Sequence, residues 1–307
     1  MKIYTITLSP AYDVHASADS LMLCHENLAH VTSRDAGGKG INISRALTFN
    51  GIENTAVVVL GRENCADFKN ALDADQMRYI GIEKDGRIRE NITIHTKGED
   101  ETRISFSGFP LDNGILSEVE NLLEADENCV ITFTGSVPKG VEMTAIKKFL
   151  ADLKSKGSKI VVDSRSFTLD DLIEVAPWLI KPNSEEISAY SGKNVECFAD
   201  CIDFAKDLLE RGIANVMISL GEKGALLVTD SICATAVPPR INALSTIGAG
   251  DSTIAGFIAA CASGADAAEC LKVAASYGTA ACLLEGTTPP TKENVADIYK
   301  DVKIEFI

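Results

Sequence analysis

Five short, continuous apolar runs recur along the chain, and they constrain its fold more than any other feature. They are residues 55–61, 129–134, 159–163, 178–181 and 216–220. Runs of this length are typical of strands that are covered on both faces, as in a parallel sheet. Amphipathic stretches separate them, which is the alternation of strand and helix that builds a layered α/β fold. We therefore predict an α/β fold with a mostly parallel sheet, whose ligands bind beyond the carboxyl ends of the strands.

A different pattern occupies residues 87–108. The segments 91–96 and 101–106 alternate between apolar and polar residues, and the turn-prone residues 97–100 join them, which predicts an antiparallel hairpin. Residues 12–36 are polar and irregular, and we expect part of them to complete a small second sheet with the hairpin. The prediction is of two domains interleaved in sequence: a main domain of residues 1–11, 37–86 and 109–307, and a β-sheet lid of residues 12–36 and 87–108.

Charge and hydropathy exclude two classes of partner. The formal charge of −15 argues against a general nucleic-acid surface, because binding to the phosphate backbone draws on clustered Lys and Arg. No segment has the ~18 consecutive apolar residues of a membrane span, so we expect no membrane partner. Residues 1–8 alternate like a strand and lack the apolar run and cleavage site of a signal peptide, which predicts a cytoplasmic protein.

The nine cysteines are scattered and odd in number, and no two form a Cys-x-x-Cys pair, so we expect reduced, mostly buried thiols. Cys197 and Cys201 would lie one turn apart if this segment is helical. The four histidines supply no adjacent cluster of ligands, and we therefore expect no structural zinc site.

A glycine-rich turn, Thr246-Ile247-Gly248-Ala249-Gly250-Asp251-Ser252, leads into an Ala-rich apolar segment of helical character. Glycines let backbone N–H groups approach an anion closely, and the first turn of a helix adds unpaired donors and positive dipole. Asp251 in that turn is able to take a proton from an attacking hydroxyl while the N–H groups stabilise a transferring phosphoryl group. The alternative is that Asp251 only caps the helix.

Two further motifs directly follow predicted strands. Lys181-Pro182-Asn183-Ser184-Glu185-Glu186 offers Asn and Glu oxygens that suit a hydrated Mg²⁺, or it is a helix start with acidic residues in its first turn. Ser219-Leu220-Gly221-Glu222-Lys223-Gly224 allows a nucleotide to lie close to the backbone, or it is only a hairpin turn. Because both motifs precede the glycine-rich turn and follow successive strands, a common ATP site is the simpler explanation.

A fourth loop, Gly37-Gly38-Lys39-Gly40-Ile41-Asn42, also feeds a segment of helical spacing. Together with residues 7–13 and Gly135-Ser136-Val137-Pro138, these motifs run in one order nearly end to end. The chain resembles the PfkB branch of the ribokinase-like sugar kinases, most closely the 1-phosphofructokinase and tagatose-6-phosphate kinase group. The resemblance implies a three-layer αβα domain with a β-sheet lid, ATP and Mg²⁺, and a sugar phosphate as acceptor. Lids of this kind often pair into homodimers.

The resemblance also implies roles for individual residues. Asp251 resembles the catalytic base, and the N–H groups of Gly248, Ala249 and Gly250 resemble the anion hole. The implied acceptor contacts are Asp13, Gly37, Gly38 and Asn42, with Lys39 and Arg89 meeting its existing phosphate. The implied nucleotide contacts are Lys181, Asn183, Ser219, Gly221, Lys223 and Gly224, and Asn183 and Glu186 are the implied Mg²⁺ pair, acting through water. The alternative for each of the four cationic residues, Lys39, Arg89, Lys181 and Lys223, is an ordinary charged side chain on the surface.

These expectations predict an ATP-dependent kinase that phosphorylates the 6-hydroxyl of fructose 1-phosphate. The alternatives are a tagatose-6-phosphate kinase or 6-phosphofructokinase, a kinase for an unphosphorylated sugar or nucleoside, and a sugar-phosphate-binding regulator without catalysis. One departure bears on the choice, because the family often has an Arg in the lid near position 28, where this chain has His25-Glu26-Asn27-Leu28-Ala29-His30. Lys139, Arg103 or His30 are candidates to replace that cation.

Overall fold

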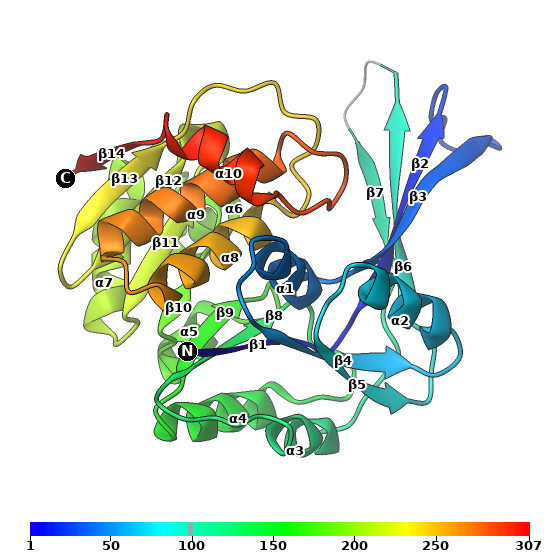
Figure 1. The fold of residues 1–307 in the computed structure, drawn as a ribbon, viewed down its shortest axis with the longest axis horizontal. Helices are drawn as coiled ribbons and strands as arrows, with labels where there is room; N and C mark the ends of the chain where they lie inside the picture. The colour runs from blue at the N-terminus through cyan, green and yellow to red at the C-terminus, as the bar shows by residue number, and fades with distance from the viewer. Residues whose placement is uncertain (98–100) are drawn as a thin grey trace.

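The computed structural model describes residues 1–97 and 101–307 and contains two β-sheets (Figure 1). The larger has ten strands in the order β14-β13-β12-β11-β10-β9-β8-β1-β4-β5. Their bounds are β1 (Lys2–Thr7), β4 (Thr55–Gly61), β5 (Tyr79–Lys84), β8 (Cys129–Thr134), β9 (Lys159–Asp163), β10 (Leu179–Ile180), β11 (Asn215–Ser219), β12 (Ala225–Thr229), β13 (Cys233–Val237) and β14 (Lys303–Phe306). Each of the five apolar runs coincides with or overlaps one of these strands, which confirms the prediction.

The larger sheet is parallel from β5 to β11 and antiparallel from β11 to β14. The change of direction occurs at the hairpin between β11 and β12, which residues 219–224 form. A mostly parallel sheet is therefore confirmed, and the hairpin interpretation of residues 219–224 is confirmed with it.

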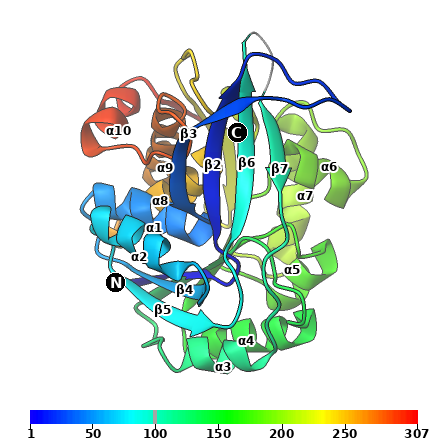
Figure 2. The same ribbon diagram turned by 90° about the vertical axis from the view of Figure 1, so that its right-hand side faces the viewer.

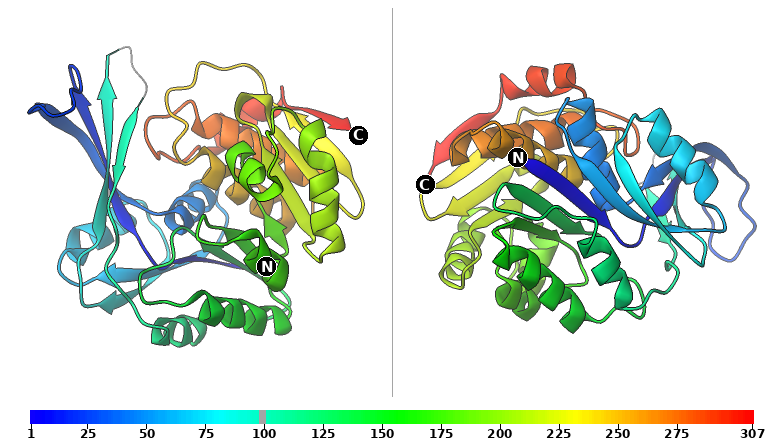
Figure 3. Two further views of the ribbon diagram at one scale, coloured as in Figure 1. Left: turned by 180° about the vertical axis from the view of Figure 1, so that it is seen from behind. Right: turned by 60° about the horizontal axis from the view of Figure 1, so that its bottom comes forward.

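Helices cover both faces of the larger sheet, which makes three layers (Figure 3). One face packs against α3 (Gly114–Glu120), α4 (Met143–Ser155), α5 (Leu169–Val175), α6 (Ser184–Ser191) and α7 (Ala199–Glu210). The other packs against α1 (Lys39–Phe49), α8 (Ala249–Ala262), α9 (Ala267–Ala281) and α10 (Lys292–Tyr299). Side chains alternate between the two cores along a strand, as Ile3 and Tyr4 do in β1. No helix in the described ranges combines the length and apolarity needed to cross a bilayer.

The small sheet has the order β3-β2-β6-β7, and Figure 2 shows it standing beside the main body with β2 and β6 at its centre. Its strands are β2 (Ala11–Ala18), β3 (Ala29–Gly37), β6 (Arg89–Thr96) and β7 (Thr102–Ser105). β6 and β7 pair antiparallel, as the alternation predicts, although the central residues of the predicted turn, 98–100, lie outside the described residues. β2 pairs with β6 in parallel and with β3 antiparallel.

The description of residues 12–36 as irregular is wrong, because two strands cover most of that range. One face of β2 packs apolar side chains, among them Tyr12, whose ring lies edge-on against Phe68 of α2 (Cys65–Ala74). The other face carries the buried polar side chains Asp13 and His15. A strand with buried polar residues on one face resembles a loop in sequence, which is why the strand pattern was obscured.

The chain leaves β1 for the small sheet and returns through Gly37 into α1. β1 lies between β4 and β8: the chain passes from β1 to β4 and β5 on one side and then crosses from β5 to β8 on the other. In open parallel sheets, ligands bind at such a switch point, beyond the carboxyl ends of the strands. The glycine loop of residues 37–42 lies at this position.

Candidate active site

The glycine-rich turn forms the start of α8. Gly248 is the N-cap with a left-handed φ of 77°, and Asp251 is the third residue of the helix. The first N–H groups of an α-helix have no partner within the helix. The N–H of Ala249 makes a long hydrogen bond of 3.4 Å to the Thr246 carbonyl, and the N–H of Gly250 remains available to an anion. Asp251 does not act as a cap, because its Oδ2 accepts a hydrogen bond from Asn42 Nδ2 at 2.8 Å.

The carboxylate of Asp251 is buried, and burial raises its pKa to about 6, against the opposing attraction of Lys39 and the hydrogen bond from Asn42. Desolvation disfavours the charged form of a carboxyl group, which makes it a better proton acceptor once it is ionised. A base with a pKa just below neutral pH is suited to accept a hydroxyl proton during turnover.

Lys39 and Asp163 form an ion pair beside Asp251, with Lys39 Nζ 2.8 Å from Asp163 Oδ2. Asp163 is the last residue of β9, and Lys39 is the first residue of α1. Burial alone would lower the pKa of Lys39, but Asp163 and Asp251 outweigh it and raise that pKa. Burial would likewise raise the pKa of Asp163, but Lys181 and Lys39 hold it below the usual value. Both groups are therefore charged at neutral pH.

Lys181 follows β10, and its side chain reaches the start of α8. A Cβ atom at Gly250 would lie 3.0 Å from Lys181 Nζ, so only glycine leaves room for the ammonium group at this point. Lys181 is buried, which excludes the interpretation as an ordinary surface charge. A cation beside the free N–H groups of a helix start strengthens the attraction for a phosphate.

Asn183 and Glu186 form a reciprocal capping box at the start of α6. Asn183 Oδ1 accepts from the N–H of Glu186 at 2.9 Å, and Glu186 Oε2 accepts from the N–H of Asn183 at 3.0 Å. The helix-start interpretation is therefore correct as far as it goes. Glu186 Oε1 lies 3.4 Å from Arg165 Nε and borders a cavity of about 10 Å³, room for one water molecule.

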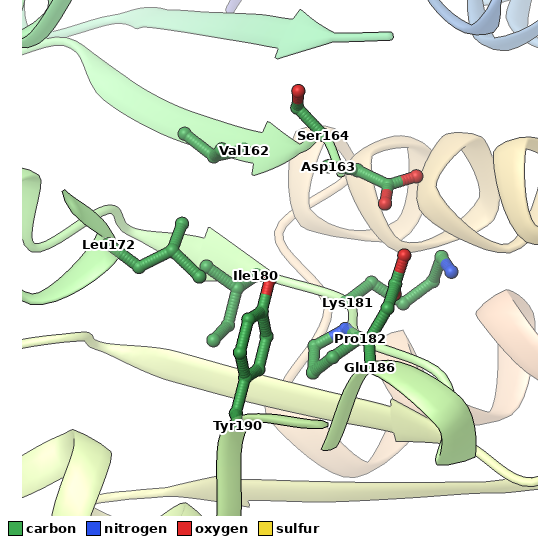
Figure 4. A pocket seen from close by; sticks show the side chains of 9 residues that line it. All are labelled: Val162, Asp163, Ser164, Leu172, Ile180, Lys181, Pro182, Glu186 and Tyr190. Atoms are coloured by element: carbon green, nitrogen blue, oxygen red, sulfur yellow. The ribbon is translucent and has the colours of Figure 1, made fainter. Parts of the chain in front are cut away.

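Figure 4 shows Asp163, Lys181 and Glu186 directed toward one another across this cavity. The two carboxylates are hard oxygen donors, which fit Mg²⁺ bound through water together with the phosphates of a nucleotide. In residues 1–97 and 101–307, no group of three His, Cys, Asp or Glu side chains is arranged to hold a metal ion directly. The donor set suits a hydrated ion that arrives with its nucleotide.

The predicted nucleotide residues of the β11–β12 hairpin lie beside this centre. Ser219 forms a parallel bridge with Asn183, which joins the two strand-end motifs. Gly221 and Gly224 have left-handed φ angles of 56° and 101°, and at Gly224 a Cβ would lie 2.0 Å from the Ala236 carbonyl oxygen. Lys223 is exposed, and its Nζ donates to the Glu196 carbonyl at 2.6 Å rather than reaching α8. Lys223 and Glu196 border a hollow of 330 Å³.

Two of the predicted acceptor residues, Asp13 and Arg89, lie on the polar face of the small sheet, whereas Lys39 and Asn42 lie on α1 beside Asp163 and Asp251. Asn91 Nδ2 donates to Asp13 Oδ1 at 2.9 Å, and Arg103 Nη2 lies 3.6 Å from the same oxygen. Burial lowers the pKa of Arg89, while the charges of Asp13 and Arg103 lie close enough to act on it in opposite directions. The Arg89 guanidinium donates to the carbonyls of Phe106 and Ser9, at 2.8 and 3.5 Å. Two guanidinium groups therefore lie near one carboxylate, which leaves excess positive charge for an anion.

Gly37 and Gly38 join the two parts of the site. A Cβ at Gly37 would lie 2.1 Å from Asp13 Oδ2, so the backbone itself closes over that carboxylate. Gly38 is the N-cap of α1, and the next turn carries Asn42, which contacts Asp251. Within the described residues, Asn42 Oδ1 and Asn91 Oδ1 are buried without a hydrogen-bond partner.

The sequence analysis missed two residues of this arrangement, and a third, Arg103, was only a candidate replacement for the lid cation. Asp163 is the clearest omission, although an Asp at the end of an apolar run was a usable signal. Asn91 stands at the start of the alternating segment, where its polarity alone predicted no contact with Asp13. A buried carboxylate next to an anion-binding helix start, with Lys39 and Lys181 beside it, is equipped to deprotonate a hydroxyl and stabilise a phosphoryl group in transit.

Comparison with known proteins agrees with this chemistry. A family model described as pfkB family carbohydrate kinase matches residues 9–294. A 1-phosphofructokinase of Escherichia coli (strain K12) is 34% identical over 266 residues, which cover 84% of this chain and 83% of that protein. The ATP-dependent 6-phosphofructokinase isozyme 2 of the same strain is 27% identical over 305 residues, with 97% and 98% covered. A crystal structure of phosphofructokinase-2 from E. coli in complex with substrates and products has a TM-score of 0.92 at 26% identity and covers 98% of this chain and 99% of that one.

The family match spans most of the chain, and the 34% identical relative is aligned over more than two thirds of both proteins. The fold has the three layers and the additional small sheet that the family resemblance implied. This chain belongs to the pfkB family of carbohydrate kinases, phosphotransferases that use ATP as cosubstrate.

Proposed function

We propose that this kinase transfers the γ-phosphate of ATP to the 6-hydroxyl of fructose 1-phosphate and forms fructose 1,6-bisphosphate. The observation that carries the proposal is the buried carboxylate of Asp251, which has a pKa of about 6 and stands in the first turn of α8 beside Lys39 and Lys181. The 1-phosphofructokinase relative supports the choice of acceptor.

In the proposed reaction, Asp251 takes the proton of the attacking hydroxyl, and the N–H groups of Gly248, Ala249 and Gly250 hold the transferring phosphoryl group. Asn42 orients the carboxylate through its 2.8 Å hydrogen bond. Phosphoryl transfer asks the protein mainly for positioning and charge stabilisation. Lys181 lies at the backbone of Gly250 and supplies positive charge at that point.

The nucleotide is proposed to lie between the start of α8 and the β11–β12 hairpin, against Ser219, Gly221 and Gly224, with Lys223 at its edge. Mg²⁺ enters with ATP, and Glu186, held by its capping box with Asn183, orders the water around it. The ion supplies charge neutralisation at the phosphates. Lys39 is held by its ion pair with Asp163 beside Asp251. In this scheme it therefore acts at the reacting centre as well as on the acceptor.

The phosphate already on the acceptor is proposed to meet Arg89 and Arg103, while Asp13 and Gly38 contact sugar hydroxyls. A phosphate would find excess positive charge there, and Arg89 Nε is a buried donor without a partner in the described chain. Arg103 is positioned to replace the family cation that is absent near position 28. This assignment supports a phosphorylated acceptor over a free sugar.

The small sheet is proposed to be a lid over the acceptor, with the boundaries 12–36 and 87–108, and the remainder to be the main domain. A homodimer through this lid is part of the proposal, as is a cytoplasmic location. Large apolar side chains are exposed on and near β3, with Leu23 86% and Leu28 82% exposed. Such side chains in one neighbourhood suit a protein interface.

The second candidate is phosphorylation of fructose 6-phosphate at the 1-hydroxyl. It is favoured by the likeness to the E. coli phosphofructokinase-2 structure at a TM-score of 0.92. The two acceptors differ in which end of the sugar carries the phosphate, so the same anion site would receive either one.

The test is ADP formation with Mg·ATP and each of fructose 1-phosphate, fructose 6-phosphate, tagatose 6-phosphate, fructose and ribose, compared by kcat/KM. We expect the highest value for fructose 1-phosphate. A higher value for a 6-phosphate would move the assignment to the second candidate, and activity on free sugars alone would refute the phosphate site. No sugar-dependent ADP formation would refute the proposed function.

A further inference from the structure

Two histidines stack on the polar face of the small sheet, beyond the groups assigned to the acceptor. His15 Nδ1 lies 3.0 Å from His95 Nε2, and the ring centroids are 5.3 Å apart with an interplanar angle of 20°. His15 stands two residues after Asp13 on β2, and it is only 5% exposed. The His95 side chain is 38% exposed, and its direct hydrogen bond with the buried His15 fixes the orientation of both rings.

The tautomer of the pair follows from what lies on the far side of His95. Glu101 Oε1 is 3.7 Å from His95 Nδ1. A carboxylate at that edge favours a proton on Nδ1, so Nε2 accepts a hydrogen bond from His15 Nδ1. Glu101 lies beyond hydrogen-bond distance and acts through its charge, while His95 and His15 are hydrogen-bonded directly and His15 Nε2 points away from the pair.

The far edge of His15 contacts the main body at the loop between α9 and α10, which extends toward the small sheet in Figure 1. A Cβ atom at Gly286 would lie 2.9 Å from His15 Nε2 and 3.3 Å from its Cε1. Gly286 also has a left-handed φ of 59°. Only glycine lets the loop approach the imidazole this closely.

The same loop packs against the anion-binding turn. Thr287 is 7% exposed, and a Cβ at Gly248 would lie 3.8 Å from its Cα and Cγ2 atoms. Two consecutive residues, Gly286 and Thr287, therefore connect His15 on the small sheet with Gly248 at the start of α8. The small sheet and the anion-binding turn are therefore both in contact with the same short segment, residues 286–287.

We propose that the His15–His95 pair is a latch that holds the small sheet closed against residues 286–287, and that His15 is a positioning residue for phosphoryl transfer. The inference rests on the proposed function. The latch keeps the acceptor, bound at Asp13, at a fixed distance from the phosphoryl group at Gly248. A closed sheet also excludes water, so the latch keeps ATP from being hydrolysed without an acceptor.

The contact itself is tested by thermal unfolding, which needs no substrate. Gly286→Ala and His15→Ala are made separately and together. In the wild-type background the new methyl group meets the imidazole, whereas in the His15→Ala background only the strain of the positive φ remains. We expect Gly286→Ala to lower Tm more in the first background than in the second. Equal losses in both backgrounds would overturn the latch.

Gly264→Ala is the matched control for this cycle. Gly264 has a φ of 82°, and a Cβ there would meet nothing within 4 Å. Its Tm loss should be the same with and without His15, because it reports only the strain of the backbone. A dependence of this control on His15 would show a general destabilisation and would overturn the interpretation of the cycle.

The positioning role is tested by the stoichiometry of turnover. For His15→Ala we expect the acceptor KM to rise up to about tenfold, as for one lost hydrogen bond, with more ADP formed per sugar bisphosphate than in wild type. His15→Asn keeps a donor near the position of Nδ1 and should restore part of both values. A lower Tm with unchanged KM and stoichiometry would overturn the role. Absence of turnover in the wild-type protein would refute the proposed function instead, and the unfolding cycle would still decide the contact.

Discussion

The start of α8 and the polar face of the small sheet are both buried, but they leave their polar groups in different states. At α8, Asp163 is paired with Lys39, and Asp251 accepts from Asn42. On the small sheet, Asn91 Oδ1 and Arg89 Nε are buried without a partner in the described residues. A buried polar group without a partner is costly, and a ligand that supplies the partner gains that free energy.

In the proposed scheme, the start of α8 carries out the reaction and the small sheet selects the acceptor. The centre at α8 is complete before substrates bind, which is what electrostatic preorganisation requires. In the proposed scheme, the acceptor supplies the partners that the polar groups of the small sheet lack. Asn42 links the two, since its Nδ2 donates to Asp251 while its Oδ1 has no partner in the described residues. Changes at the centre should therefore lower kcat, and changes on the small sheet should raise the acceptor KM.

Apart from the loss of Asp251 itself, Lys39→Met should produce the largest of these effects. It removes the cation that lies between Asp163 and Asp251, and two buried carboxylates are left close together. We expect kcat to fall about a hundred- to thousandfold, as for the loss of one preorganised charge at a reacting centre. Steady-state kinetics at saturating acceptor measures it. Lys148→Met, at an exposed position of α4, is the control, and an equal loss there would contradict the assignment.

Asp251→Asn should change the pH dependence of unfolding. The wild-type carboxyl has a pKa of about 6 when folded and 3.8 when unfolded, so the folded state holds the extra proton between these values. The free energy of unfolding of the wild type therefore falls by about 3 kcal/mol as pH rises through that range, whereas the Asn variant has no such loss. The variant should match wild type near pH 4 and exceed it above about pH 6. Denaturant unfolding across pH measures the difference, and a constant offset would contradict the raised pKa.

Arg103→Met should weaken acceptor binding more than it slows the reaction. Loss of one guanidinium from the pair with Arg89 should raise KM for a sugar phosphate about tenfold, with kcat little changed. Fructose, which carries no phosphate, is the internal control because its KM should not move. Equal increases for both acceptors would show that Arg103 supports the sheet and does not bind phosphate.

Gly250→Ala should give the smallest effect. The new Cβ would lie 3.0 Å from Lys181 Nζ, the flexible end of a long side chain, so the ammonium is displaced while the fold is kept. We expect the Kd of ATP to rise a few-fold, on the order of 1 kcal/mol. Titration of the variant with ATP measures it. An unchanged Kd would mean that Lys181 does not contact the nucleotide.

Local sequence patterns predicted the elements whose cause is local. The apolar runs became the buried strands because a parallel sheet covered on both faces needs apolar side chains on both. The glycine-rich turn became a helix start because Gly248 takes a left-handed φ that other residues avoid. The expectation that part of residues 12–36 joins the small sheet is confirmed by β2 and β3. The bounds of these strands were not predicted, because the polar residues of β2 are buried by the site and not exposed in a loop.

The contacts of the site depend on pairs that are distant in the sequence. Asp163 and Lys39 are 124 residues apart, and Asn42 and Asp251 are 209 apart. No local pattern records such a pairing, so the candidate site residues came from the family resemblance, which did not include Asp163. In the proposed site, acceptor recognition depends on how Arg89 and Asn91 of β6 lie relative to Arg103 of β7, and this geometry is absent from spacing alone.

The central claim is that Asp251 is the base of the reaction, and the most direct measurement compares turnover and ATP binding in Asp251→Asn. Asn keeps the shape and the contact with Asn42 but cannot accept the hydroxyl proton. We expect kcat to fall about ten-thousandfold while the Kd of ATP stays within about threefold of wild type. Substantial turnover in the variant, or an equal loss of ATP affinity and turnover, would contradict the claim.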